Sequence, residues 1–215
     1  MTFPSLKFDP IAADAAADFE SQRQLVRHQS RVEDLLRDAA LPKRHTEPCD
    51  LDEVQARTLG RITASMGKGA VWALVGERGI GKTQVVVAVA RHVCWNEHRA
   101  FYTRAQTVFY SIRAAMNDKN GAGELGVIGR HTAPELLIID EAHERGETPF
   151  EDRTLVHIVD TRYAEMKDTI IIANLTAQEF QTSIGKSILD RIREDGGIIE
   201  CTAANGWKNY RRGAK

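Results

Sequence analysis

The chain has 215 residues but only three cysteines, and their spacing excludes two classes of protein. Cys49, Cys94 and Cys201 are odd in number and far apart, so they provide neither a disulfide framework nor a C-x-x-C metal site. We expect them to be buried apolar thiols.

Long apolar runs and a dominant charge are also lacking. No stretch approaches the roughly 18 apolar residues that span a bilayer, and the start, MTFPSLKFDP, lacks the apolar segment of a signal peptide. We therefore expect a cytoplasmic protein that makes no membrane contact. The net charge is −1, so no overall basic field marks a nucleic-acid-binding protein.

Short, fully apolar runs are present, and they predict a parallel β-sheet. Three of them show no alternation of apolar and polar residues: 71–75, 136–139 and 170–173. This pattern is typical of strands that helices cover on both faces. Two further strands are expected at 99–104 and 198–201. Between the predicted strands, apolar residues recur at helical spacing, at Val85, Val89 and Val93 and over 105–117. The predicted fold class is α/β, a three-layer sandwich with a parallel five-stranded sheet.

The N-terminal region predicts a helix over residues 21–40, because Leu25, Val32, Leu36 and Ala39 share one narrow face. Leu41-Pro42 ends it, so residues 1–41 are expected to form a helical extension and residues 42–215 the main domain. The face fits packing on the chain's own domain and packing on a partner equally well.

Two features are expected between these elements. A second helix is predicted from Asp50 or Asp52, either of which can cap it, to about Ser65. The glycine-rich stretch 117–129 is predicted to be a mobile loop.

The stretch "GERGIGKT" directly follows the apolar run 71–75 and matches G-x-x-x-x-G-K-[ST]. In this motif, successive backbone N–H groups surround the phosphates of a nucleotide at the start of a helix. A chance match somewhere in the chain has a probability of roughly one in a hundred. We expect Lys82 to reach the β- and γ-phosphates and Thr83 to bind Mg²⁺. The expected nucleotide-binding residues are Gly76, Glu77, Arg78, Gly79, Ile80, Gly81, Lys82 and Thr83.

Two later apolar runs end in polar residues that complete this chemistry. Asp140 follows the run 136–139, where its carboxylate suits Mg²⁺ through a water. Glu141 is expected to polarise the water that attacks the γ-phosphate. Phosphate-loop proteins with this adjacent glutamate usually insert an extra strand between the two motif strands. The run 170–173 is predicted to be that strand, and Asn174 to hold the attacking water from the other side.

Longer stretches resemble the AAA+ ATPases of the DnaC-like helicase loader group, with the IstB-like transposition helpers as their nearest relatives. The similarity covers about Leu41 to Arg212. It is carried by the nucleotide motifs and by "IIDEAHERGETPFEDRTLVHIVDTRY", "IIIANLTAQEF", "IGKSILDRIREDGG" and "NGWKNYRR". Two departures are visible: the short region before Leu41 has no zinc-binding cysteines, and no complete helical lid fits after Cys201.

The resemblance implies an Mg²⁺-dependent ATPase that forms an ATP-dependent homo-oligomer. By this analogy Arg191 is the arginine finger and Arg211 the sensor-2 arginine. The implied partners are a replicative hexameric helicase and single-stranded DNA. An IstB-like transposition helper, or an assembly adaptor that hydrolyses little ATP, remain alternatives.

For DNA, the segment 99–119 is a candidate, since its basic and aromatic residues could pair with phosphates and stack on bases. These residues are Arg104, Arg113, Lys119, Phe101, Tyr102, Phe109 and Tyr110. The helical spacing of Phe109, Ile112 and Met116 favours a core face instead.

Overall fold

The computed structural model describes residues 10–45, 50–117, 123–146 and 148–210. The strands are β1 (Val71–Gly76), β2 (Ala100–Arg104), β3 (Leu136–Asp140), β4 (Asp168–Ala173) and β5 (Gly197–Cys201). The α-helices are α1 (Pro10–Asp38), α2 (Glu53–Thr63), α3 (Lys82–Trp95), α4 (Ala105–Asn117), α5 (Gly123–Thr132), α6 (Pro149–Ala164), α7 (Ala177–Ser183) and α8 (Lys186–Asp195).

All five strands form one parallel sheet in the order β2-β3-β4-β1-β5. The prediction of a five-stranded parallel α/β fold is therefore confirmed. Strand β4 lies between β1 and β3, with Ala73 opposite Ile171 and Ile139 opposite the same Ile171. The run 170–173 is thus the inserted strand that the sequence predicts.

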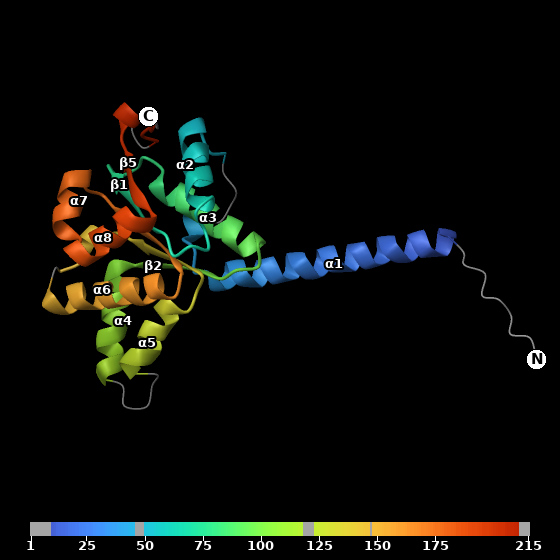
Figure 1. Cartoon of the computed structure of the whole chain (residues 1–215), viewed down its shortest axis with the longest axis horizontal. Helices are drawn as coiled ribbons and strands as arrows, with labels where there is room; N and C mark the ends of the chain where they lie inside the picture. Colours follow the sequence, from blue (N-terminus) through green and yellow to red (C-terminus); the bar gives the residue numbers. More distant parts are fainter. Residues whose placement is uncertain (1–9, 46–49, 118–122, 147, 211–215) are drawn as a thin grey trace, which may run out of the picture.

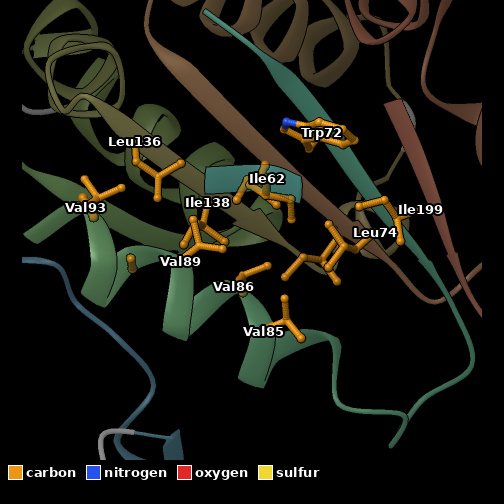
Figure 2. Close-up of a cluster of buried hydrophobic side chains, with 14 of the residues drawn as sticks. Ile62, Trp72, Leu74, Val85, Val86, Val89, Val93, Leu136, Ile138 and Ile199 are labelled. Atoms are coloured by element: carbon orange, nitrogen blue, oxygen red, sulfur yellow. The ribbon is translucent and has the colours of Figure 1, made fainter. Parts of the chain in front are cut away.

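Helices cover both faces of the sheet, which makes three layers (Figure 1). Successive strand side chains point to opposite faces, so Trp72 and Leu74 pack with α2 and α3, whereas Val71 and Ala73 pack with α4, α6 and α8. Figure 2 shows the first of these clusters, in which the apolar face of α3 meets alternate residues of the strands. Because the strands are parallel, the carboxyl ends of β1, β3 and β4 lie at one edge of the sheet.

Helix α1 is longer than expected and projects from the domain (Figure 1). Its C-terminal part and the residue that follows it pack on the chain's own domain, since Val32 and Ala39 are buried and the Ala39 carbonyl accepts a 2.9 Å hydrogen bond from the Tyr102 N–H in β2. Further out, the side chain of Leu25 is 53% exposed. The predicted apolar face is therefore buried in the core at its C-terminal end and exposed at Leu25.

The stretch 117–129 was expected to be a loop, and this is wrong for its second half. Residues 123–132 form α5, whose Val127 and Ile128 pack on the cluster under α4. This packing outweighs the cost of about 1 kcal/mol that each helical glycine carries. Residues 118–122, in the first half, lie outside the described part of the chain.

Of the two residues expected to cap α2, Asp52 is the one that does so. Its side chain accepts a hydrogen bond from the Gln55 N–H. Cys94 and Cys201 are buried thiols, and burial raises the pKa of Cys201 to about 12; Cys49 lies outside the described residues. Within the described ranges, no helix is both long enough and apolar enough to cross a membrane.

Candidate active site

The phosphate loop joins β1 to α3 and begins at a close backbone approach. A Cβ on Gly76 would lie 2.1 Å from the Cys201 carbonyl oxygen of the neighbouring strand, so only glycine fits there. At the other end, Gly81 has φ 93° and would place a Cβ 2.2 Å from Gln55 Nε2. The motif glycines thus let the loop pass between β5 and α2 on its way into α3.

Lys82 is the first residue of α3, and its side chain folds back over the loop. Its ammonium group donates to the carbonyls of Gly76 (2.7 Å) and Glu77 (2.8 Å) and to Asn174 Oδ1 (2.9 Å). Burial lowers the pKa of Lys82, and the nearby Cys201 and Asp140 offset part of that shift. The expected phosphate-binding cation therefore lies at the edge of the loop, already beside the residue that follows β4.

Thr83 and Asp140 come together although 57 positions separate them. Thr83 Oγ1 lies 3.3 Å from Asp140 Oδ2, and the Tyr102 hydroxyl donates to the same carboxylate oxygen at 2.5 Å. Burial, then the charge of Asp140, raises the pKa of Tyr102, so the phenol stays protonated and acts as a donor. A hydroxyl and a carboxylate oxygen at this separation form an oxygen donor set that suits Mg²⁺.

Glu141 is held in an unusual backbone conformation beside Asp140. Its φ of 54° lies in the left-handed region, which costs a non-glycine residue about 1 kcal/mol, and its N–H donates to Asp140 Oδ1 at 2.7 Å. The Glu141 carboxylate pairs with Arg104 at 3.3 Å (Nε to Oε2). Residues held in such strained conformations cluster at functional sites, where the fold enforces them.

Asn174 follows β4 and faces Lys82, as described above. Its N–H donates to Nδ1 of His143 at 3.2 Å, and burial lowers the pKa of His143, which favours the neutral ring that this acceptor role requires. His143 was not among the residues expected at the site. It follows Glu141 by two positions, and nothing in its spacing indicates the contact.

Most of these groups line a pocket of about 510 Å³, within the 300–1,000 Å³ range of ligand sites, but Gly76, Glu77 and His143 are not on its wall. The expected residues on its wall are Arg78, Gly79, Ile80, Gly81, Lys82, Thr83, Asp140, Glu141 and Asn174. Eight other wall residues were not predicted as nucleotide contacts: Pro42, Arg44, His45, Gln84, Tyr102, Arg104, Ile172 and Tyr210. Ile172 and Tyr210 belong to stretches quoted for the resemblance, and Tyr102 and Arg104 to the candidate DNA segment 99–119, whereas Pro42, Arg44 and His45 carry no sequence signal.

The two arginines inferred from the resemblance are placed differently. Arg191 on α8 is not part of the pocket wall; it pairs with Asp160 (3.3 Å) and Glu194 (3.0 Å), and its guanidinium lies 4.4 Å from the centre of the Tyr163 ring. Arg211 lies outside the described residues. The chain does reach the pocket one residue earlier, at Tyr210.

Most of the aromatic residues considered for DNA binding are used inside the protein. Phe109 lies on α4 and is buried, Phe101 packs against the same apolar cluster, and the Tyr102 hydroxyl is bound to Asp140. Arg104 and Arg113 pair with Glu141 and Glu151. The side chain of Tyr110 is 63% exposed, whereas Lys119 lies outside the described residues.

The sheet order and the phosphate loop with its two partner strands define an ATP-binding protein of the AAA+ class of phosphate-loop NTPases. Within that class the chain belongs to the IstB-like ATP binding protein family, which matches residues 17–212.

Among the curated relatives of the chain, two kinds of functional name occur. The chain is 26% identical over 180 residues to a putative insertion sequence ATP-binding protein, y4pL, of Sinorhizobium fredii, covering 77% of this chain and 71% of that protein. It is 24% identical over 137 residues to the replicative helicase loader DnaC of Buchnera aphidicola, covering 64% and 54%. It is also 25% identical over 179 residues to the uncharacterized protein YdaV of Escherichia coli, covering 79% and 71%. The chain thus spans about half the length of that DnaC.

Solved structures share the fold at low sequence identity. A crystal structure of the DnaC helicase loader has a TM-score of 0.61 at 17% identity, covering 74% of this chain and 99% of that one. AMPPCP-bound DnaA from Aquifex aeolicus has a TM-score of 0.63 at 16% identity, covering 75% and 51%. These similarities establish the fold alone.

Proposed function

We propose that this chain is an ATP-driven helicase loader, which binds ATP and single-stranded DNA and helps to place a replicative hexameric helicase on DNA. The observation that carries the proposal is the meeting of Lys82, Thr83, Asp140, Glu141 and Asn174 at one pocket, in a chain related to DnaC. The helicase and the DNA are inferred from that relationship.

Hydrolysis would proceed by in-line attack of water on the γ-phosphate. Glu141 would accept the proton of that water, and Asn174 would orient it from the facing strand. Lys82 would bind the β- and γ-phosphate oxygens, with the backbone N–H groups of the loop around them. Mg²⁺, held by Thr83 and through water by Asp140, would neutralise charge on the phosphates.

Arg191 would complete the site of a neighbouring subunit in an ATP-dependent homo-oligomer. It is not on the wall of its own chain's pocket and is held by Asp160, so its expected target is the pocket of a neighbouring chain. Arginine fingers supplied in trans contribute about 10³–10⁵ to the rate in other phosphoryl-transfer proteins.

A mixing experiment tests this role. Arg191→Ala keeps the phosphate loop, whereas Lys82→Ala keeps the arginine, and each should be nearly inactive alone. Mixing them under assembly conditions should restore ATPase activity, because one interface then holds both intact groups. Arg193→Ala, on the same helix, is the control and should stay active. Full activity of Arg191→Ala by itself would rule out the finger.

We assign partner binding to the N-terminal extension, residues 1–41. Its outer part carries the exposed apolar residues Leu25 and Val26, whereas Val32 and Ala39 belong to the core. Deleting all of residues 1–41 would therefore damage the domain, and point changes are the sharper test. Leu25→Lys with Val26→Lys preserves helix propensity while removing the apolar surface.

The partner is tested by copurification with a replicative helicase and, separately, with a transposase, each with ATP present. The proposal expects the parent chain to retain the helicase and the Leu25/Val26 variant to lose it. The control Glu20→Gln with Gln24→Lys adds the same charge on the opposite side of the helix and should retain the helicase. Retention of the transposase alone would favour the second candidate, an IstB-like transposition helper, which the similarity to y4pL supports.

The ATP turnover rate distinguishes the ATPase from the third possibility, an assembly adaptor that hydrolyses little ATP. For the ATPase, we expect the rate measured with single-stranded DNA to be higher than the rate measured without it. ATP binding without turnover in either condition would favour the adaptor.

A further inference from the structure

The phosphate loop is held from outside by the chain that follows β5. The Tyr210 N–H donates to the Gly79 carbonyl at 3.0 Å, and Asn209 Nδ2 donates to the Arg78 carbonyl at 3.4 Å. The Lys82 ammonium group donates to the carbonyls of the two residues before these, Gly76 and Glu77. Four consecutive carbonyls, 76–79, therefore accept hydrogen bonds from the protein itself. In trans peptides the following N–H groups, 77–80, point the opposite way.

Tyr210 also connects this loop to α2. Its hydroxyl donates to Asp52 Oδ2 at 2.8 Å, while Asp52 Oδ1 accepts the capping bond from the Gln55 N–H at 2.9 Å. Burial favours a higher pKa for Asp52, but the bonds from Gln55 and Tyr210 bring that pKa below its usual value, so the acceptor is ionised. The Tyr210 ring lies 3.3 Å from where a Cβ on Gly81 would be.

The segment that carries these contacts is fixed in the core. Trp207 is buried with Ile199 and Cys201, and its N–H donates to the Thr202 carbonyl at 3.1 Å. We call residues 207–210 the C-terminal clasp. Its anchor lies in the core and its tip lies on the wall of the pocket.

We propose that Tyr210 is a positioning residue for nucleoside triphosphate binding, through which the C-terminal clasp keeps the phosphate loop in its ligand-ready shape. The inference rests on the proposed ATP site and goes beyond it. A loop whose carbonyls are bound outward needs little reordering when its N–H groups receive phosphates, and such preorganisation increases affinity. The Asp52 bond makes the start of α2 part of the same support.

The test compares Tyr210→Ala, Tyr210→Phe and Asp52→Ser with the parent protein. Serine still caps α2 but has no second oxygen for the tyrosine hydroxyl. ATP affinity is measured by calorimetry with Mg²⁺ present. We expect Tyr210→Ala to bind about tenfold more weakly, and Tyr210→Phe and Asp52→Ser about threefold more weakly each.

Two further readouts separate positioning from general destabilisation. The Tyr210→Phe, Asp52→Ser double variant should bind no more weakly than either single variant, because both remove one bond. KM for ATP should rise while kcat at saturation stays unchanged, since the clasp acts on binding. Thr182→Ala, which removes an exposed hydroxyl on α7 away from the pocket wall, should change neither.

Unchanged ATP affinity in Tyr210→Ala would overturn the inference, as would fully multiplicative losses in the double variant. An equal loss of affinity in Ile158→Val, a core change on α6, which packs against α5, α8 and β4, would show that destabilisation alone accounts for the effect and would also overturn it. A parent protein that does not bind ATP refutes the ATP site itself, which is a distinguishable result.

Discussion

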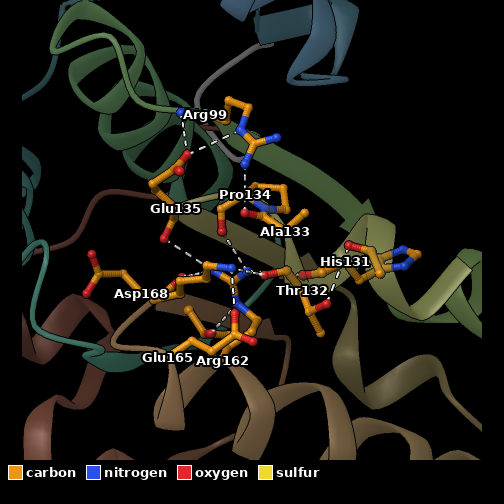
Figure 3. A network of polar contacts seen from close by, with 12 residues as sticks. Arg99, His131, Thr132, Ala133, Pro134, Glu135, Arg162, Glu165 and Asp168 are labelled. Atoms are coloured by element: carbon orange, nitrogen blue, oxygen red, sulfur yellow. Dashed lines mark hydrogen bonds and ion pairs between the residues drawn. The ribbon is translucent and has the colours of Figure 1, made fainter. Parts of the chain in front are cut away.

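Lys82 and Arg162 are buried cations at opposite edges of the same sheet, and both donate to backbone carbonyls. Lys82 lies at the carboxyl edge, is 5% exposed and lines the 510 Å³ pocket. Arg162, from α6, lies at the amino edge and is 0% exposed (Figure 3). Its guanidinium donates to Thr169 Oγ1 and to the carbonyls of His131, Thr132, Pro134, Glu135 and Asp168.

The difference shows why burial and hydrogen bonding do not by themselves identify a binding residue. Burial lowers the pKa of Arg162 to about 10, so it remains charged at neutral pH, with its donors consumed by the chain. Burial also lowers the pKa of Lys82, but phosphate oxygens in the adjoining pocket can take over its donors. We therefore propose that the cation beside open space binds phosphate, whereas the enclosed cation supports the fold.

Replacing Arg162 should have the largest effect. Arg162→Met keeps an unbranched side chain but leaves a group of buried carbonyls without a donor, so we expect the free energy of unfolding to fall by about 3–5 kcal/mol. Urea unfolding measures it. Arg153→Met, on the exposed side of α6, should stay within about 0.5 kcal/mol of the parent. An unchanged midpoint for Arg162→Met would contradict the structural role.

Lys82→Ala should break binding rather than the fold. We expect ATP affinity to fall at least about 100-fold, because a charge-assisted contact to the β- and γ-phosphates is lost. Arg78→Ala, in the same loop but exposed and paired with Glu144, should lose only a few-fold. Equal ATP affinity of Lys82→Ala and the parent would show that Lys82 does not bind the phosphates and would contradict the contrast with Arg162.

Tyr102→Phe tests the support behind Asp140. Without the hydroxyl, the carboxylate loses its 2.5 Å donor, and the Mg²⁺ concentration for half-maximal ATPase should rise about tenfold. Tyr110→Phe is the matched control. A Tyr102→Phe protein with the Mg²⁺ requirement of the parent would show that the contact is not used by the metal site.

Arg104→Ala should have the smallest effect. The exposed ion pair with Glu141 is worth less than about 1 kcal/mol, so its removal should raise turnover without DNA about two- to threefold by freeing the carboxylate. Steady-state ATPase measures this. A fall in turnover would mean that Arg104 orients Glu141 for catalysis.

The sheet and the pocket could be predicted because their signals are local. Uninterrupted apolar runs mark strands covered on both faces, and each site residue directly follows such a run: Lys82 through its loop, Asp140 and Asn174 at once. Parallel strands bring their carboxyl ends to one edge, so the grouping follows from the topology.

Two helices were misjudged because tertiary contacts or composition override the pattern. The start of α1, from Pro10, is rich in alanine and has no apolar periodicity, although alanine favours a helix intrinsically. Helix α5 contains three glycines that indicate a loop, yet it packs under α4.

Contacts between distant residues escape any local pattern. Tyr102 is 38 positions from Asp140, and Tyr210 is 158 positions from Asp52. The stretch containing Asp160, Arg162 and Tyr163 supports the resemblance as one motif, but the structure divides it. Asp160 and Tyr163 hold Arg191 on the surface, whereas Arg162 closes the amino edge.

The most direct test of the proposed ATPase site is a paired measurement of ATP binding and single-turnover hydrolysis in Glu141→Gln. The substitution keeps the shape of the side chain and removes the base, while Lys82, Thr83 and Asp140 remain. We predict ATP affinity near that of the parent and hydrolysis at least about tenfold slower. Hydrolysis at the parent rate would contradict the assignment of Glu141 and, with it, the mechanism proposed for this pocket.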